Sequence, residues 1–82
     1  MNKKKLILEI FKKRLNLKPN EIKDIQSNKF KKFELGTHQN WDSIQHVNII
    51  SDIEKKFKIN VNDKNFVNFG QLEKILIFLK II

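Results

Sequence analysis

The sequence predicts an all-α fold: a bundle of three longer helices and one short third helix, with a long first loop, in a single domain spanning residues 1–82. Three segments carry apolar residues at the spacing of an amphipathic helix. An aspartate, one of the preferred N-cap residues, stands directly before the central segment. The chain is long enough for one small hydrophobic core and is near the lower size limit for a domain that folds alone.

The first helix is expected over residues 2–15. Its inner face is formed by apolar residues one helical turn apart, and charged residues occupy the opposite face. The inner residues are Ile7, Ile10, Phe11 and Leu15.

Residues 16–41 contain several asparagines, Gly36 and no sustained period. Pro19 favours a short helical turn that would run to Ile25, since proline is well tolerated at the first helical position. A connection this long inside a compact domain is usually functional, or a helix or strand within it has been missed.

The second long helix is expected over residues 43–57. Asp42 would cap it, and Gln45 three positions later completes an Asp-x-x-Gln variant of the capping box, so the helix should begin at Ser43. Its buried stripe is expected at the apolar positions Ile44, Val47, Ile50, Ile53 and Phe57.

This placement sets the Ser43 hydroxyl at the positive end of a helix dipole. A phosphate esterified there would be stabilised by free backbone N–H groups and the dipole, by about 0.3 to 1 kcal/mol if exposed. The pattern therefore indicates a serine suited to covalent modification.

The C-terminal part of the chain begins with a turn at residues 60–63 and one short helical turn at residues 64–67. Asn68 is a candidate cap for the last helix. The inner stripe of that helix is expected at Leu72, Ile75, Leu76 and Leu79.

The net charge of +8 raises the possibility of a nucleic-acid partner. Lys, Ile, Asn and Phe together make up more than half of the chain, and all four have A/T-rich codons, so base composition also explains the lysine excess. Only one of the 17 basic residues is arginine, the residue that nucleic-acid readers tend to use. We favour a solvated basic surface and keep a small basic helical nucleic-acid-binding module as the alternative function.

The chain has no cysteine, which excludes disulfides and thiolate chemistry of its own and suits a reducing compartment. The apolar run after Lys3, Lys4 and Lys5 is too short for a signal peptide, and the run at residues 75–79 is far too short to span a bilayer. We expect a cytoplasmic protein without stable membrane insertion.

At residues 41–59 the sequence resembles an acyl carrier protein, the helical family whose Asp-Ser-Leu or Asp-Ser-Ile motif opens its second helix. The resemblance includes the motif at residues 42–44, Val47, and the Glu-x-x-Phe-x-Ile pattern at residues 54–59. Residues 68–72 with Ile75 and Leu79 are similar to the family's last helix, and residues 6–15 match its first helix only as a pattern. The resemblance implies an acyl-carrier-like bundle whose long first loop lies across it, with anchors expected at Ile22, Ile25, Phe30, Phe33 and Leu35.

The function implied by this resemblance is carriage of a group, without catalysis by the chain itself. A phosphopantetheinyl transferase would attach 4′-phosphopantetheine from coenzyme A to Ser43, and the prosthetic thiol would hold an acyl or aminoacyl group as a thioester. The other implied partners of this monomer are acyl-loading and acyl-transfer or condensing enzymes. The residues expected to form the core, or to line it for an acyl chain, are Val47, Ile50, Ile53, Phe57, Leu72, Ile75 and Leu76.

Partner enzymes and the transferase are expected to recognise the surface of the same helix. The residues expected to take part are Asp42, Ile44, Gln45, Glu54, Lys55 and Lys56. Acyl carrier proteins are usually acidic on this face, whereas Lys55 and Lys56 are basic, so cognate partners should present acidic or neutral docking surfaces. The Trp-Asp-Ser opening, His46 and the Asn68-Phe-Gly70 start of the last helix look more like a stand-alone carrier of a specialised pathway.

Other site chemistry is weakly supported. Ser43, His46 and Asp42 could suggest a nucleophile, base and orienter, but we expect Asp42 and His46 to project into solvent without a pocket, so no catalytic site is predicted. The two histidines and the scattered carboxylates show no metal-ligand spacing, and no metal site is predicted.

Trp41 is expected to be a packing anchor at the entry to the helix. A surface-bound amphipathic protein would also explain the apolar C-terminal residues.

Overall fold

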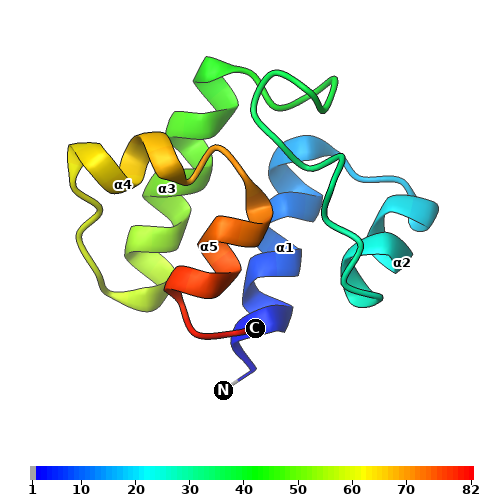
Figure 1. Cartoon of the computed structure of the whole chain (residues 1–82), viewed down its shortest axis with the longest axis horizontal. Helices are drawn as coiled ribbons and strands as arrows, with labels where there is room; N and C mark the ends of the chain where they lie inside the picture. Colours follow the sequence, from blue (N-terminus) through cyan, green and yellow to red (C-terminus); the bar gives the residue numbers. More distant parts are fainter. Residues whose placement is uncertain (1) are drawn as a thin grey trace.

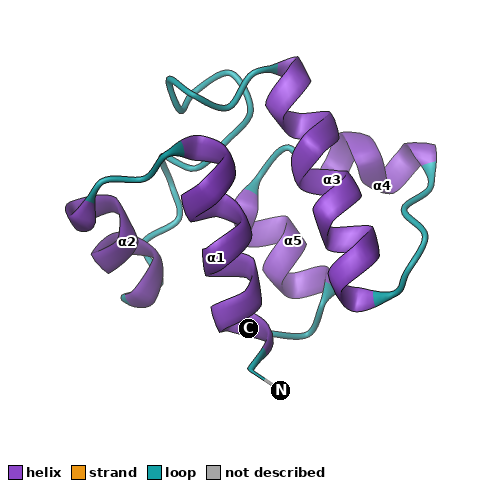
Figure 2. Ribbon diagram, turned by 180° about the vertical axis from the view of Figure 1, so that it is seen from behind, coloured by secondary structure: helices purple, strands orange, loops and turns teal. Residues whose placement is uncertain are grey.

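A computed structural model describes residues 2–82 and has an all-α fold measuring 31 × 28 × 19 Å. Its five helices are α1 (Lys3–Leu15), α2 (Pro19–Gln26), α3 (Ser43–Phe57), α4 (Asp63–Asn68) and α5 (Leu72–Phe78). The long helices α1 and α3 lie side by side in front of α5, with α2 beyond α1 and α4 beyond α3 (Figure 2). No helix in residues 2–82 is long and apolar enough to cross a membrane.

The ends of the helices follow local sequence signals. Asn2 caps α1 by accepting a hydrogen bond from the Lys5 amide, and Asn62 caps α4 in the same way. Helices α1 and α3 both end at a residue in the left-handed conformation, Asn16 and Lys58, whose N–H returns to the last turn.

The fold has five helices where four were predicted, because the expected turn after Pro19 extends to two helical turns. Pro19 occupies the first position of α2, and the Glu21 carboxylate accepts the Lys18 backbone N–H. The predicted long loop is therefore shortened to residues 27–42. The expected short helix near residues 64–67 is confirmed as α4.

One core joins the helices and the loop. Its fully or nearly buried residues include the predicted inner faces of α1 and α5. The loop contributes Phe30 and Phe33, and α2 contributes Ile25, as predicted for its anchors. Ile22 is half-buried, whereas Leu35, also predicted as an anchor, is exposed.

The buried face of α3 is rotated from the predicted one. Ile50 and Ile53 are buried as expected, but Ile44 and Val47 are 71% and 54% exposed, so their placement in the buried stripe was wrong. His46 and Ile49 occupy the inner face in their place, and Phe57 is half-buried against the core. The polar partners of His46, described below, set this rotation.

The start of α5 also differs from the prediction. Asn68 ends α4, and Gln71 precedes the first residue of α5 without a side-chain cap. The backbone here pairs with the first loop instead, since the Leu35 N–H donates to the Gly70 carbonyl (2.7 Å) and the Leu72 N–H to that of Phe33 (3.0 Å). These two bonds tie residues far apart in the sequence and displace the helix start from Asn68.

Arg14 of α1 and Asp52 of α3 form a two-bond ion pair between the two long helices. Arg14 Nε lies 2.6 Å from Asp52 Oδ2, and Nη2 lies 3.0 Å from Oδ1. These hydrogen bonds from Arg14 hold the pKa of Asp52 below its ordinary value. The ion pair therefore adds a polar link to the apolar contact between α1 and α3.

Truncation of Ile53, whose side chain is fully buried, should be severe. We expect Ile53→Ala to lower the free energy of unfolding by about 2 to 5 kcal/mol through lost burial and a cavity, measured by urea denaturation followed by circular dichroism. Val47→Ala on the same helix is the matched control and should change stability by less than about 0.5 kcal/mol. Equal losses in the two variants would contradict the rotation of α3 described here.

The Arg14–Asp52 pair should make stability depend on acid. Because the folded pKa of Asp52 is lowered, its contribution is present above the unfolded value of about 3.9 and is lost as pH falls through the folded pKa. Wild type should therefore exceed Asp52→Asn in unfolding free energy near neutral pH, and the difference should shrink progressively as pH falls from the unfolded pKa through the lowered folded pKa. Glu9→Gln, an exposed carboxylate change on α1, should show little difference across the same titration.

Candidate functional site

Ser43 is the first residue of α3, and its side chain is exposed. Asp42 before it is in an extended conformation, and its Oδ1 accepts the Gln45 backbone N–H at 2.8 Å. The predicted helix start and N-cap are therefore confirmed. Only this half of the predicted capping box forms, because Gln45 Oε1 instead accepts from Asn48 Nδ2 at 3.4 Å.

The loop that leads into Ser43 is held by its own backbone bonds. The Gly36 N–H donates to the Trp41 carbonyl, and the Trp41 N–H donates to that of His38. Gly36 has a φ of 84°, a conformation that glycine adopts at low cost. Asn40 Nδ2 reaches the Leu15 carbonyl at the end of α1, at 2.7 Å. Ser43 is thus presented from a closed turn fastened to the bundle, at the start of α3. This end of α3 lies near the top of Figure 1.

Trp41 and His46 form a buried polar contact beneath Ser43. Trp41 packs edge-on against Phe11, as expected for an anchor, and its Nε1 donates to His46 Nδ1 at 3.1 Å. Since an indole nitrogen can only donate, Nδ1 of His46 must be the accepting nitrogen. His46 Nε2 then carries the proton and donates to the Phe66 carbonyl at 2.7 Å.

The expected solvent exposure of His46 was therefore wrong, because the side chain is 2% exposed. Its one accepting nitrogen takes the Trp41 indole, so His46 is not placed to remove a proton from Ser43. The imidazole acts as a structural link between the loop, α3 and α4.

A second buried histidine escaped the sequence analysis. His38 Nδ1 accepts the Asn40 backbone N–H, and Nε2 lies 2.6 Å from Glu21 Oε2. Burial alone would raise the pKa of Glu21, but the Lys18 N–H and His38 outweigh it, and the pKa lies below its ordinary value. The Glu21–His38 contact fixes α2 to the loop. No sequence pattern predicts this contact. Glu21 was expected in a short helical turn and His38 in the loop, and the spacing between them is not characteristic of any motif.

The residues predicted to meet partners are divided between the two ends of α3. Ile44, directly after Ser43, is exposed, and so is Val47, which was predicted for the core instead. Glu54 is half-buried and its Oε2 accepts the Val61 N–H at 2.9 Å, so this carboxylate holds the α3–α4 connection. Lys55 and Lys56 are exposed in the last turn of the helix.

The residues predicted for the core or for an acyl chain are mostly buried. Five of the seven are buried, Phe57 is half-buried, and Val47 lies outside the core. The buried five are Ile50, Ile53, Leu72, Ile75 and Leu76. Within residues 2–82, no group of three or more His, Cys, Asp and Glu side chains is arranged to hold a metal ion.

Comparisons of the chain with protein-family models, curated proteins and solved structures found no match. The function is therefore argued from the geometry around Ser43 and from the sequence pattern.

The Trp41–His46 bond should contribute measurably to stability. Trp41→Phe keeps an aromatic ring but removes the donor, so a buried acceptor on His46 loses its partner, and we expect a loss of about 1 to 3 kcal/mol. The measurement is urea denaturation followed by circular dichroism. A double-mutant cycle with His46→Leu should give a coupling of about 0.5 to 3 kcal/mol. Strict additivity of the two changes would show that the bond is not formed.

Proposed function

We propose that the chain is an acyl carrier protein that holds an acyl or aminoacyl group as a thioester on 4′-phosphopantetheine attached to Ser43. The observation that carries this proposal is the exposed Ser43 at the first position of a 15-residue helix, directly after a capping aspartate. The resemblance of residues 41–59 to acyl carrier proteins supports it. The arrangement of α1, α3, short α4 and α5 around one core supports an acyl-carrier-like bundle.

The residues around Ser43 fit the phosphodiester. The Ser43 oxygen would bond to the phosphorus of the pantetheine phosphate, and the bond between the two coenzyme A phosphates would break, releasing adenosine 3′,5′-bisphosphate. The new anion would lie at the positive end of α3, which stabilises it by about 0.3 to 1 kcal/mol. Because Asp42 Oδ1 already caps α3 by accepting the Gln45 N–H, the Ser43 hydroxyl is not needed as the cap.

When bound, the prosthetic group supplies the thiol that this cysteine-free chain lacks. The chain's own contribution is placement: Asp42 and Trp41 fix the start of α3, and Ile44 and Val47 offer an apolar surface beside Ser43. Exposed apolar side chains of this kind suit transient contacts with the transferase and with the enzymes that load or use the carrier.

Lys55 and Lys56 would set the charge of the distal part of this surface. Because like charges across an interface slow encounter, partners adapted to this carrier should be acidic or neutral there. This property supports a stand-alone carrier of a specialised pathway. It gives no support to a housekeeping carrier read by enzymes adapted to acidic partners.

Incubation with a broad-specificity phosphopantetheinyl transferase, Mg²⁺ and coenzyme A should add one phosphopantetheine to the chain, as measured by intact mass. Ser43→Ala should abolish the addition, and peptide mass spectrometry should assign it to Ser43. Ser51, half-buried within α3, and Ser27 are the internal controls. Addition to either of them, or none to the wild type, would contradict the proposal.

Asp42→Asn separates helix capping from recognition of the carboxylate, since asparagine caps about as well as aspartate. Retained stability with slower modification would assign Asp42 a contact with the transferase. An unchanged rate of modification would mean that Asp42 only caps the helix.

A further inference from the structure

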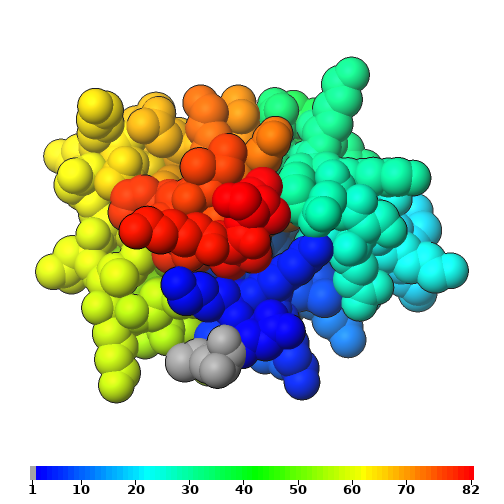
Figure 3. Space-filling model, turned by 60° about the horizontal axis from the view of Figure 1, so that its bottom comes forward, coloured from blue at the N-terminus to red at the C-terminus, as the bar shows by residue number. Residues whose placement is uncertain are grey.

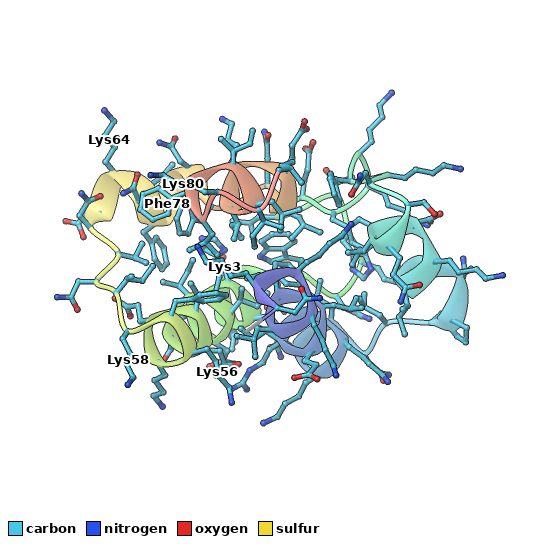
Figure 4. The ribbon with its side chains drawn as sticks, turned by 90° about the horizontal axis from the view of Figure 1, so that it is seen from below. Lys3, Lys56, Lys58, Lys64, Phe78 and Lys80 are labelled. Atoms are coloured by element: carbon cyan, nitrogen blue, oxygen red, sulfur yellow. The ribbon has the colours of Figure 1, made fainter. Side chains whose placement is uncertain are left out.

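Four exposed lysines lie at the end of the molecule opposite Ser43. They come from separate elements: the start of α1, the end of α3 and the residue pair after α5 (Figure 4). These are Lys3, Lys56, Lys58 and Lys80, called here the basic end. The sequence separates them by up to 77 positions, so only the fold brings them to one end.

Hydrogen bonds close the bundle at the basic end. Lys3 Nζ donates to the Leu79 carbonyl at 3.2 Å, which fastens the start of α1 to the end of α5. The Ile81 N–H returns to the Leu76 carbonyl at 2.8 Å. In the space-filling view these first and last segments meet, with the end of α3 beside them (Figure 3).

Apolar side chains are exposed on α5 and after it. Phe78, which lies beside Lys80, is 43% exposed and rests edge-on against buried Phe69, at a centroid distance of 5.0 Å. Ile77 and Ile82 are about half exposed. Lysines around exposed aromatic and aliphatic side chains are typical of surfaces that rest at the boundary of an anionic bilayer.

We propose that the basic end binds the surface of an anionic lipid bilayer. The lysine ammonium groups would meet the acidic headgroups, and Phe78 would enter the boundary between headgroups and acyl chains. This inference goes beyond the carrier function and does not depend on it.

A bilayer suits this surface better than a nucleic acid does. The one arginine, Arg14, is held by Asp52 between α1 and α3, so no guanidinium is offered for bidentate phosphate or base contacts. Exposed Ile77 and Ile82 would gain nothing from a solvated duplex, whereas they lose exposed apolar area at a lipid interface.

The geometry also fixes the orientation of the bound protein. Ser43 and the basic end lie at opposite ends of α3, whose 15 residues rise about 22 Å. Binding by the basic end would therefore leave Ser43 in the aqueous phase, open to enzymes.

The test is co-sedimentation of the full chain with sucrose-loaded vesicles. Binding is expected to vesicles of equal parts phosphatidylcholine and phosphatidylglycerol, and not to pure phosphatidylcholine. The triple variant Lys56→Gln, Lys58→Gln, Lys80→Gln should lower the partition coefficient about 100-fold, at about fivefold per lysine. The matched variant Lys23→Gln, Lys29→Gln, Lys31→Gln has the same net charge but changes exposed residues around α2, and it should bind much as the wild type does.

The depth and orientation are tested by fluorescence quenching with lipids brominated on their acyl chains. The single tryptophan, Trp41, is buried at the Ser43 end, so its emission should not be quenched when the wild type binds. Phe78→Trp should introduce quenchable emission. Circular dichroism checks that this variant is folded.

Several results would overturn the proposal. Equal losses in the two triple variants would mean that net charge alone attracts the chain to vesicles. Absence of binding to the anionic vesicles would exclude the bilayer, and retention on duplex DNA or RNA instead would assign the basic end to nucleic acid.

Discussion

The buried imidazole of His46 is the constraint on which the placement of the candidate site depends. A polar group inside an apolar core is costly unless each nitrogen finds a partner, and here Trp41 and the Phe66 carbonyl are those partners. Satisfying both requires α3 to turn its His46 face inward and requires the loop to bring Trp41 against Phe11. Ile44 and Val47 are consequently left on the outer surface beside Ser43.

The long first loop is made part of the domain by polar contacts of the same kind. His38 and Glu21 join it to α2, Asn40 joins it to α1, and the backbone of Phe33 and Leu35 joins it to the α4–α5 turn. A chain of this size has a small core, so these bonds and the aromatic anchors Phe30 and Phe33 order a segment that would otherwise be mobile. The order of the loop in turn fixes where α3 begins.

Helix α3 connects two surfaces of different character. Its first turn presents Ser43 with exposed apolar neighbours, and its last turn contributes to the basic end. Opposite ends of one rigid helix can serve different partners at the same time, because neither partner covers the other's contact. In the proposals made here, enzymes would meet the first end and an anionic bilayer the second.

Local signals were sufficient to predict much of this protein. They predicted the helical period, the Asp42 cap before Ser43, Pro19 at the start of α2, and the inner faces of α1 and α5. Each of these features depends on residues within one or two helical turns. The rotation of α3, the burial of both histidines, the start of α5 at Leu72 and the placing of four lysines at one end could not. Each of these depends on contacts between separate parts of the chain. The helical period of the sequence records hydrophobicity alone, so it places Val47 in the core and His46 on the surface. It does not record which polar groups find hydrogen-bond partners inside the protein. The sequence alone determined which serine begins the long helix, whereas the tertiary structure decided what surrounds it.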